Sequence, residues 1–464
     1  MERFHLAALA MLASGVALSG CASGPPHRGS DGVGALVAAR GLPDLTWARG
    51  EAARLPSPTG RVSRADALKL AFANNAQVRE LYARLGIASA DVVEASRLAN
   101  PRLAYIDLRP EGGGLSQITR SVSLDFTNAL LLPSRARLAR AEFQRSQEVV
   151  ADTLLDLSAR VEEAWFQAVS ARQVAELREL AATASDASSE MAKRLYDAGN
   201  LSPKGLALES AAASEQRVAA ARAKADATRT REALAGLMGL STRDAWQVPG
   251  RLPALKEQGN PDLDEVTLLQ VAATQRLDLS AARRQVANET DFASMTRHWR
   301  WLGDLEGGYE RESDTDGSRL RGPTLALSLP LFNQNQSGVM RADAQAEMSR
   351  ARLSDLELRV KNDVARDLDR LTSAREIAEA YRTAVLPQRE LLVSSTQEEH
   401  NFMLVGVFEL LQARRSQLDA YQSYVEAVRD YWLARTDLRK SLGGALPGEN
   451  PSDIDTAEVL GEAQ

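Results

Sequence analysis

The sequence predicts a mainly helical, internally duplicated fold with a small β part, and three observations predict it. Two stretches are longer than the helices of an ordinary globular domain, Ser134–Ala198 without Gly or Pro and Val339–Val405 with only Pro387. Each stretch follows a segment of alternating polar and apolar residues. Matching residues in the two halves, such as Ser123 and Ser328, are 205 positions apart (328 − 123). Because self-similarity at a fixed spacing marks a repeated architecture, each half is one unit of about 200 residues.

The composition agrees with long helices and excludes one class of function. Of the 464 residues, 44% are hydrophobic but only 5% are aromatic, a balance typical of helices rich in Ala, Leu, Arg and Glu. The formal net charge is −6. A protein that binds nucleic acid needs a basic patch or stripe, so no nucleic-acid partner is expected.

The first 20 residues have the features of an export signal. Arg3 precedes an apolar stretch at residues 6–18, which has the length of a signal core and is short for a membrane span. The signal ends in Leu18-Ser19-Gly20-Cys21, which resembles a bacterial lipobox. Cys21 is the only cysteine, so a covalent lipid on Cys21 is the one modification expected and no other cofactor is implied. The alternative is an ordinary signal peptide that leaves Cys21 as an idle thiol.

Segments rich in Gly, Pro and Ser divide the rest of the chain into connected parts. The predicted organisation is a signal peptide at 1–20, a lipidated extended tether at 21–60, a first repeat at 61–240, an equatorial linker at 241–262, a second repeat at 263–442 and a C-terminal tail at 443–464.

Two short strands are expected before each long helix. The first pair is predicted at 102–109 and 117–126, and the second pair at 302–311 and 322–332. Apolar and polar residues alternate in each, so one face of the strand is apolar and the other is polar or acidic. Arg120 interrupts the apolar face of its strand. The apolar faces carry Ala104, Ile106 and Leu108; Ile118, Val122, Leu124 and Phe126; Leu305, Gly307 and Tyr309; and Leu325, Leu327, Leu329 and Leu331.

The long stretches predict two helical hairpins, at 134–235 and 339–442. A 65-residue helix is about 100 Å long, and no four-stranded sheet offers a surface that could bury it. It therefore has to pack along other helices as a coiled coil. The apolar residues of the first stretch alternate in steps of four and three, as a coiled-coil seam requires. The seam residues are Val150, Leu154, Leu157, Val161, Ala164, Ala168 and Ala171.

These helices favour a membrane barrel over a half-buried sheet for the strands. A sheet in lipid has to close, because an open edge finds no hydrogen-bond partners there. One chain supplies four strands, whereas bacterial barrels have at least eight, so several chains have to share one barrel. Three chains would give 12 strands, and only such a larger barrel leaves a channel.

Several motifs, in this order, resemble the TolC-type outer-membrane efflux family over nearly the whole mature chain. Each is weak alone, and their order and spacing carry the resemblance. The last motif is similar to the cobalt–zinc–cadmium (CzcC-like) branch of outer membrane factor lipoproteins. The motifs are Asn74-Asn75-Ala76-Gln77-Val78, Asn100-Pro101-Arg102-Leu103, Arg194-Leu195-Tyr196-Asp197-Ala198-Gly199 and Leu329-Pro330-Leu331-Phe332-Asn333-Gln334-Asn335-Gln336.

The resemblance implies a homotrimer in the outer membrane of a Gram-negative bacterium. Its fold would be TolC-like, with a shared 12-stranded trimeric β-barrel in the membrane and a long α-helical tunnel in the periplasm. Return helices are expected at 203–234 and 407–442. The implied partners are a periplasmic adaptor (membrane fusion protein), an inner-membrane pump of the RND type and outer-membrane lipid.

In the family, the tips of the helical hairpins close the tunnel and dock the adaptor. The second tip allows two registers, one with Gly406 at the apex and one with Met403 there. In the second register Glu409 falls on an acidic family position that rings the aperture; the alternative is a plain charge on a solvated helix face. The tip residues so assigned are Asp197, Gly199, Asn200, Leu201, Met403, Val405, Gly406, Val407 and Glu409.

The expected barrel lumen carries the acids Asp125, Asp304, Glu306 and Glu310. Threefold repetition would form acidic rings that favour cations, although simple wetting of the lumen explains them equally.

No catalytic or metal-ligand constellation is present in the sequence, so an enzyme is not predicted. The predicted function is a passive exit duct of a tripartite efflux system, exporting heavy-metal cations. A TolC-type duct for drugs or for type I protein secretion is the first alternative. A non-conducting lipoprotein that links the envelope is the second.

Overall fold

The computed structural model describes residues 29–42, 55–255 and 264–448. Cys21, the signal peptide and most of the C-terminal tail lie outside these residues. The chain forms two compact units. The first contains Leu81–Val150 and Asp278–Glu357, and the second contains Gly34–Glu80, Ala151–Leu277 and Leu358–Gln464.

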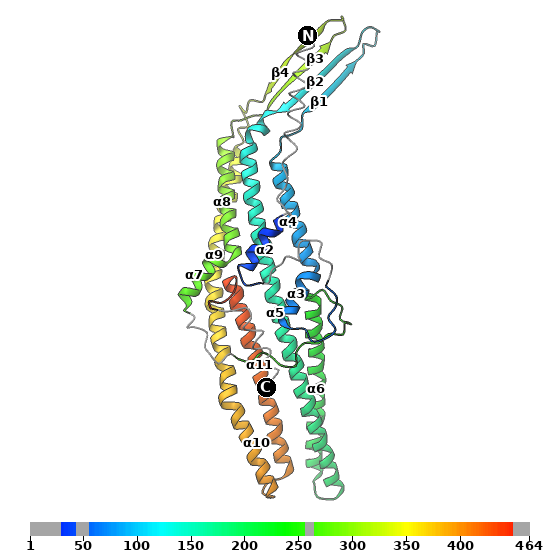
Figure 1. Cartoon of the computed structure of the whole chain (residues 1–464), viewed down its shortest axis with the longest axis vertical. Helices are drawn as coiled ribbons and strands as arrows, with labels where there is room; N and C mark the ends of the chain where they lie inside the picture. The colour runs from blue at the N-terminus through cyan, green and yellow to red at the C-terminus, as the bar shows by residue number, and fades with distance from the viewer. Residues whose placement is uncertain (1–28, 43–54, 256–263, 449–464) are drawn as a thin grey trace. The chain divides into compact units, whose positions relative to one another are not determined.

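The first unit contains a four-stranded antiparallel sheet in the order β1-β2-β3-β4 (Figure 1). The strands are β1 (Arg102–Leu108), β2 (Gln117–Asp125), β3 (Leu305–Ser313) and β4 (Arg319–Leu327). Sequential strands pair, so each predicted hairpin is present and the second strand of one joins the first strand of the other.

The register defines two faces of the sheet. Leu103, Val122, Tyr309 and Pro323 are paired across the four strands and lie on one face, here called the apolar face. The other, here called the acidic face, carries Glu306, Glu310 and Glu312 on β3.

One predicted face is corrected by this register. Ile106 is paired with Thr119, so Ala104, Ile106 and Leu108 lie on the acidic face rather than with the apolar residues of β2. Leu103 and Tyr105 take the apolar face instead. Both faces of β1 carry apolar side chains, so alternation alone could not assign its phase.

The second pair of strands is shifted from its predicted bounds. β3 begins at Leu305 instead of 302, and β4 ends at Leu327 instead of 332. Pro330 has no N–H to donate to a ladder, which limits the extension of the strand. The last ladder-like bond beyond β4 is from the Ser328 N–H to the Asp304 carbonyl, at 2.9 Å.

The predicted hairpins are present as α5 (Phe126–Asp197) with α6 (Pro203–Leu237), and as α9 (Gln336–Ala380) and α10 (Leu386–Asn401) with α11 (Val407–Leu442). The two repeats begin differently. α5 has 72 residues, starts directly after β2 and includes Pro133, whereas eight residues separate β4 from α9.

A π-helical turn at Tyr381–Val385 interrupts the second long helix just before Pro387. Proline cannot donate a hydrogen bond, and its ring clashes with the carbonyl four residues earlier. The wider turn accommodates the proline without ending the helical path.

The shorter helices differ from the sequence prediction in one place, because residues of the predicted extended tether form α2 (Ser30–Ala38), in which Val33 and Val37 are buried. Two helices, α3 (Arg64–Asn74) and α4 (Ala76–Ala95), precede β1, and the chain breaks between them at Asn75, whose backbone is extended. α7 (Glu265–Gln275) and α8 (Leu277–His298) precede β3.

Side-chain amides explain the break at Asn75. Asn74 accepts a hydrogen bond from the Leu55 N–H at 2.9 Å and donates one to the Leu55 carbonyl at 3.0 Å. The Asn75 amide donates to the Leu237 carbonyl at 2.9 Å. The turn between α3 and α4 therefore fastens segments far apart in the sequence.

An aromatic core joins the helices of the second unit to the linker around them. The rings of Phe166 and Trp432 stack at 5.4 Å. Trp165 donates from Nε1 to the Val62 carbonyl, and Trp432 donates from Nε1 to the Pro253 carbonyl, both at 3.0 Å. The predicted α5 seam is buried from Val150 to Ala168, whereas Ala171 is half-buried.

None of the described helices combines the length and the hydropathy that a membrane-spanning helix requires.

Candidate functional site: an interhelical groove, the hairpin tips and the acidic face

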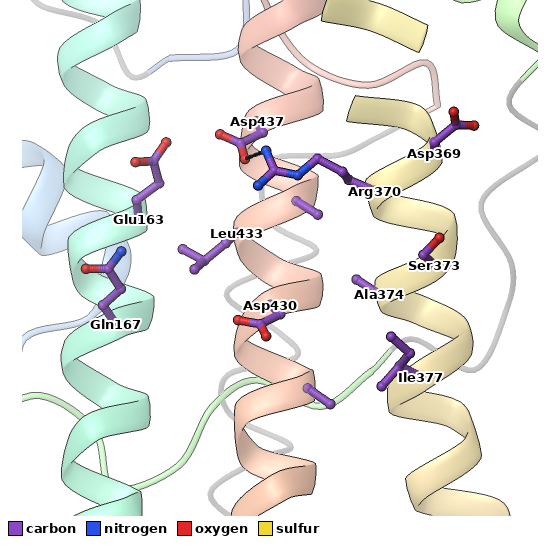
Figure 2. A pocket seen from close by; sticks show the side chains of 12 residues that line it. Glu163, Gln167, Asp369, Arg370, Ser373, Ala374, Ile377, Asp430, Leu433 and Asp437 are labelled. Carbon is purple, nitrogen blue, oxygen red and sulfur yellow. Dashed lines mark hydrogen bonds and ion pairs between the residues drawn. The ribbon is translucent and has the colours of Figure 1, made fainter. Parts of the chain in front are cut away.

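A groove lies between α5, α9 and α11 in the second unit (Figure 2). Its cavity volume is about 650 Å³. Acidic residues of all three helices line it, and Figure 2 shows Arg370 reaching Asp437, with Nη1 and Oδ2 3.4 Å apart. The charged lining residues are Glu163, Asp369, Arg370, Asp430 and Asp437.

Helical periodicity places these acids away from the aromatic core. On α11, Asp430, Leu433 and Asp437 recur at three- and four-residue steps and line the groove. Trp432 lies between them in sequence and is buried in the core. On α5, Glu163 lines the groove while Trp165 is buried. α5 and α11 each therefore carry an aromatic side toward the linker and an acidic side toward the groove.

The surroundings in the groove raise the pKa of two of its acids, Glu163 and Asp437. Burial, followed by the charge of Asp437, raises the pKa of Glu163. Burial, followed by the charge of Asp367, raises the pKa of Asp437, despite the nearby Arg370. Both carboxyls hold their protons more strongly than in water, so the charge of the groove depends on pH.

The neighbouring acid Glu162 has a lowered pKa, and its carboxylate holds the helices together through two ion pairs. Its carboxylate lies 2.7 Å from Arg64 Nη1 and 2.8 Å from Arg439 Nη1. Burial alone would raise the pKa of Glu162, but the two guanidinium groups hold this pKa below its usual value. The ion cluster thus fixes α3, α5 and α11 behind the groove.

The groove continues along α5 and α11 toward the hairpin tips, where α6 replaces α9 as the third wall. This part shares Gln167, Asp430 and Leu433 with the first. Its charged lining is mixed, with four arginines (Arg178, Arg222, Arg229 and Arg429) and three acids (Asp226, Glu426 and Asp430). The lining therefore changes along the helices from predominantly acidic to nearly balanced in charge.

The two hairpin tips have the same backbone hydrogen bonds with an offset of 204 residues (403 − 199). Gly199 has φ 76° and Met403 has φ 61°. The Asn200 N–H donates to the Leu195 carbonyl at 2.8 Å, and the Leu404 N–H donates to the Glu399 carbonyl at 2.9 Å. Both are the six-to-one bond that closes a helix after a left-handed residue.

This geometry places Met403 at the position of Gly199, as one of the two predicted registers requires. Gly406 is instead the N-cap of α11, and it corresponds to Ser202, the N-cap of α6. A left-handed backbone is unfavourable for a residue with a side chain, so the sequence offered Gly406 as the more obvious apex.

The second tip presents an apolar surface. Phe402, Met403 and Leu404 have exposed fractions of 77%, 93% and 75%. At the first tip, Asp197, Gly199 and Asn200 are exposed and polar or small, and Leu201 is half-buried. Glu409 is exposed in the first turn of α11, where a negative charge interacts favourably with the helix dipole. Val405 and Val407 are half-buried beside it.

A mostly buried ion pair joins the two hairpins above their tips. Arg415 Nη2 on α11 lies 2.7 Å from Glu209 Oε2 on α6, with exposed side-chain fractions of 16% and 13%. The same carboxylate oxygen accepts a hydrogen bond from the Ser188 hydroxyl on α5 at 2.7 Å. Three helices from two hairpins thus meet at one carboxylate.

The structure brings together three of the four predicted lumen acids. Asp125 is paired with Glu306, and Glu310 follows on the same face of β3. Ser123 donates a hydrogen bond to Glu306, and Arg102 lies 3.7 Å from it. Asp304 precedes β3 and lies outside the ladder.

Sequence reasoning missed the groove and the ion pair between the hairpins. A signal existed for the groove, because Asp430 and Asp437 are seven residues apart on a helix whose other side carries Trp432. Nothing local pointed to Glu209 and Arg415, which lie 206 residues apart. Across residues 29–42, 55–255 and 264–448, no group of His, Cys, Asp and Glu has an arrangement suited to a metal ion.

Comparisons with known proteins define the fold. No protein-family model and no curated protein sequence matches the chain. Solved structures do match. The CmeC outer membrane channel of Campylobacter jejuni has a TM-score of 0.70 at 14% identity, covering 85% of this chain and 89% of CmeC. A membrane protein of Pseudomonas aeruginosa has a TM-score of 0.69 at 18% identity, covering 82% and 92%. The outer membrane protein VceC of Vibrio cholerae has a TM-score of 0.67 at 15% identity, covering 82% and 96%.

These similarities confirm the fold class predicted from the sequence. The chain has the TolC-like fold of outer-membrane channels, with long helical hairpins and a small four-stranded sheet.

Proposed function

We propose that the protein is the outer-membrane exit duct of an efflux system. The observation that carries the proposal is the four-stranded sheet with one apolar and one acidic face. Leu103, Leu325 and Leu327 have exposed fractions of 80%, 75% and 53%. A lipid-facing wall requires such exposed apolar side chains, and a water-filled lumen requires acids behind them.

Assembly as a homotrimer follows from the number of strands. A sheet in lipid cannot keep open edges, and the four described strands are too few to close a barrel. Three copies would supply a 12-stranded barrel with a channel. The covalent lipid on Cys21 would add a second attachment to the same membrane, because acyl chains anchor a protein independently of its barrel.

The groove would line the tunnel. α5 and α11 turn their aromatic sides toward the linker segments, so their groove sides are free to face a central space. Repeated three times, Glu163, Asp430 and Asp437 would form an acidic zone, and the mixed arginines and acids nearer the tips would form a zone of more balanced charge. Such zones set the local concentration of a passing ion.

The hairpin tips would close the tunnel and dock a periplasmic adaptor that connects the duct to an inner-membrane pump. Phe402, Met403 and Leu404 support this role, since three adjacent exposed apolar side chains are typical of a surface that a partner covers. The duct itself has no energy source, so the pump would drive the transport.

Heavy-metal cations are the proposed substrates. The acidic face of the sheet and the acidic part of the groove both favour cations over anions. The resemblance of residues 329–336 to the cobalt–zinc–cadmium branch supports the same substrate class. In the first alternative, drugs or proteins would pass through the same duct. In the second alternative, a non-conducting envelope lipoprotein, the protein would form no duct.

Two measurements separate these functions. Purified protein in planar bilayers should conduct ions, and absence of conductance would leave the structural lipoprotein. A deletion strain should become sensitive to divalent metal salts, and a plasmid copy should restore resistance. Sensitivity to drugs alone, with metal resistance unchanged, would reassign the substrate while keeping the duct.

A further inference from the structure

Three arginines form a row across the apolar face of the sheet. Arg120 on β2 is paired with Arg311 on β3, and Arg311 is paired with Arg321 on β4. All three are exposed. Tyr105 on β1 is paired with Arg120 and completes the row, with the guanidinium carbon 5.7 Å from the ring centroid. This set is here called the arginine row.

The row is unfavourable for the isolated sheet. Side chains directly opposite each other in antiparallel strands lie about 5 Å apart, and like charges in these positions repel. Within the part of the chain that the structure describes, no carboxylate pairs with any of the three arginines. Glu310 and Glu312 lie on the opposite face. An anion from outside the chain would remove the repulsion.

The row marks one boundary of the apolar band. The next paired set toward the helices is Leu103, Val122, Tyr309 and Pro323, and the set after that contains Leu124 and Leu325. On the other side of the row only one further paired set precedes the turns, and it is mostly polar: Asp107, Ile118, Ser313 and Arg319. A charge on the lipid-facing side is costly at the centre of a bilayer but nearly neutral at its interface. The row therefore belongs at the level of the headgroups.

Two tryptophans mark the other boundary of the apolar band. Trp299 and Trp301 precede β3, Trp301 is 54% exposed, and Arg300 lies over its ring at 4.6 Å. Tryptophan is enriched at membrane interfaces. Trp301 and Arg311 are ten positions apart (311 − 301). At about 3.3 Å per residue and a tilt of about 40°, they span at most about 25 Å along the membrane normal, the height of the apolar band of bacterial barrels.

We infer that the arginine row binds the phosphate groups of outer-leaflet lipids, in particular a headgroup that carries phosphomonoesters. This inference rests on the proposed membrane-spanning duct. Arginine presents its N–H groups as a planar fork that matches phosphate oxygens, and adjacent guanidinium groups can share one phosphate. A phosphomonoester carries more negative charge than a phosphodiester, so it neutralises more of the row. Lipid is favoured over a free anion because the row borders an apolar band that acyl chains would cover.

The test compares the wild type with R120Q/R311Q/R321Q. Each protein is placed in nanodiscs of phosphatidylcholine alone, of phosphatidylcholine with lipid A, and of phosphatidylcholine alone with inorganic phosphate in the buffer. The midpoint of thermal dissociation of the assembly is measured, and retained lipid is counted by native mass spectrometry. A control, R283Q/R297Q/R350Q, removes three exposed arginines from helices of the same unit, each of which has a surface ion pair.

Lipid A should raise the midpoint of the wild type and of the control, and should remain bound to both. In the triple variant of the row, affinity for lipid A should fall about tenfold for each arginine removed, since a hydrogen bond to a charged group contributes about this much. Arg311→Gln alone removes the centre of the row and provides a milder variant if the triple variant does not assemble. The triple lysine variant should bind with intermediate affinity because it keeps charge but loses the fork.

Equal lipid A binding by the wild type and the triple variant would overturn the inference, as would an equal response to inorganic phosphate without lipid A. Conductance in phosphatidylcholine bilayers distinguishes this failure from failure of the proposed duct. If the protein conducts ions but does not respond to lipid A, only the inference about the arginine row is refuted, and the proposed duct is supported. A lipid A response without conductance keeps the arginine row and refutes the duct.

Discussion

Arg415 is the residue whose loss should loosen the hairpin tips. Its guanidinium lies 2.7 Å from Glu209 and joins α11 to α6, and both side chains are more than four-fifths buried. Glu209 would keep only the Ser188 hydroxyl in the Arg415→Gln variant. A hydrogen bond between charged groups contributes about 1.5–3 kcal/mol, so local opening of the tips should become easier by this amount.

Native-state hydrogen exchange measures this local opening directly. A change of about 1.5–3 kcal/mol corresponds to exchange that is about 10- to 140-fold faster, which should be seen in the amides between Leu195 and Leu206 and between Glu399 and Leu410. Glu209→Gln should have a similar effect. In the double variant, the free energy of local opening should decrease by clearly less than the sum of the decreases in the two single variants, because both changes remove the same ion pair.

The matched control is Arg229→Gln. Arg229 pairs with Asp226 on the surface of α6, with exposed side-chain fractions of 73% and 63%, and such a pair contributes about 0–1 kcal/mol. If Arg415→Gln accelerated tip exchange no more than Arg229→Gln does, the ion pair between the hairpins would not hold the tips closed.

Three further predictions follow from the sheet, the anchor and the groove. Leu325→Arg, on the apolar face, should destabilise the assembled protein by about 2–4 kcal/mol near the membrane centre, whereas Ala326→Arg on the acidic face should be tolerated; equal yields of assembled protein would contradict the face assignment. Cys21→Ser should abolish labelling with radioactive palmitate, and undiminished labelling would exclude this anchor. The raised pKa values of Glu163 and Asp437 mean that the folded state binds more protons than the unfolded chain. Their contribution to stability should therefore be lost as pH rises from about 4 through the raised pKa values, so the variant with Glu163→Gln and Asp437→Asn should gain stability relative to the wild type as pH rises; identical pH profiles would show that these two groups do not titrate as described.

Much of the fold is encoded in local patterns. The coiled-coil steps from Val150 to Ala168 predict a buried seam, and the same residues are buried in the structure. The predicted start and end of α11, Val407 and Leu442, are the observed ones, since a glycine flanks each end. Such features depend on residues within a few turns of each other, so a single sequence is sufficient to find them.

The tips show where local patterns stop being sufficient. The sequence allows two registers for the second tip, with either Gly406 or Met403 at the apex. The hydrogen bond from the Leu404 N–H to the Glu399 carbonyl decided for Met403. A non-glycine residue in a left-handed conformation is held by the geometry around it, which no propensity predicts.

The sequence by itself determined the long helices, the four strands and the duplication, because each follows from periodicity, whereas the export signal stays a prediction. Only the tertiary structure decided which residues meet across elements. It moved Ile106 to the acidic face, aligned Arg120 with Arg311 and Arg321, and brought Glu209 to Arg415. These contacts join residues up to about two hundred positions apart, and their register depends on the free energy of packing the whole chain rather than on any local pattern.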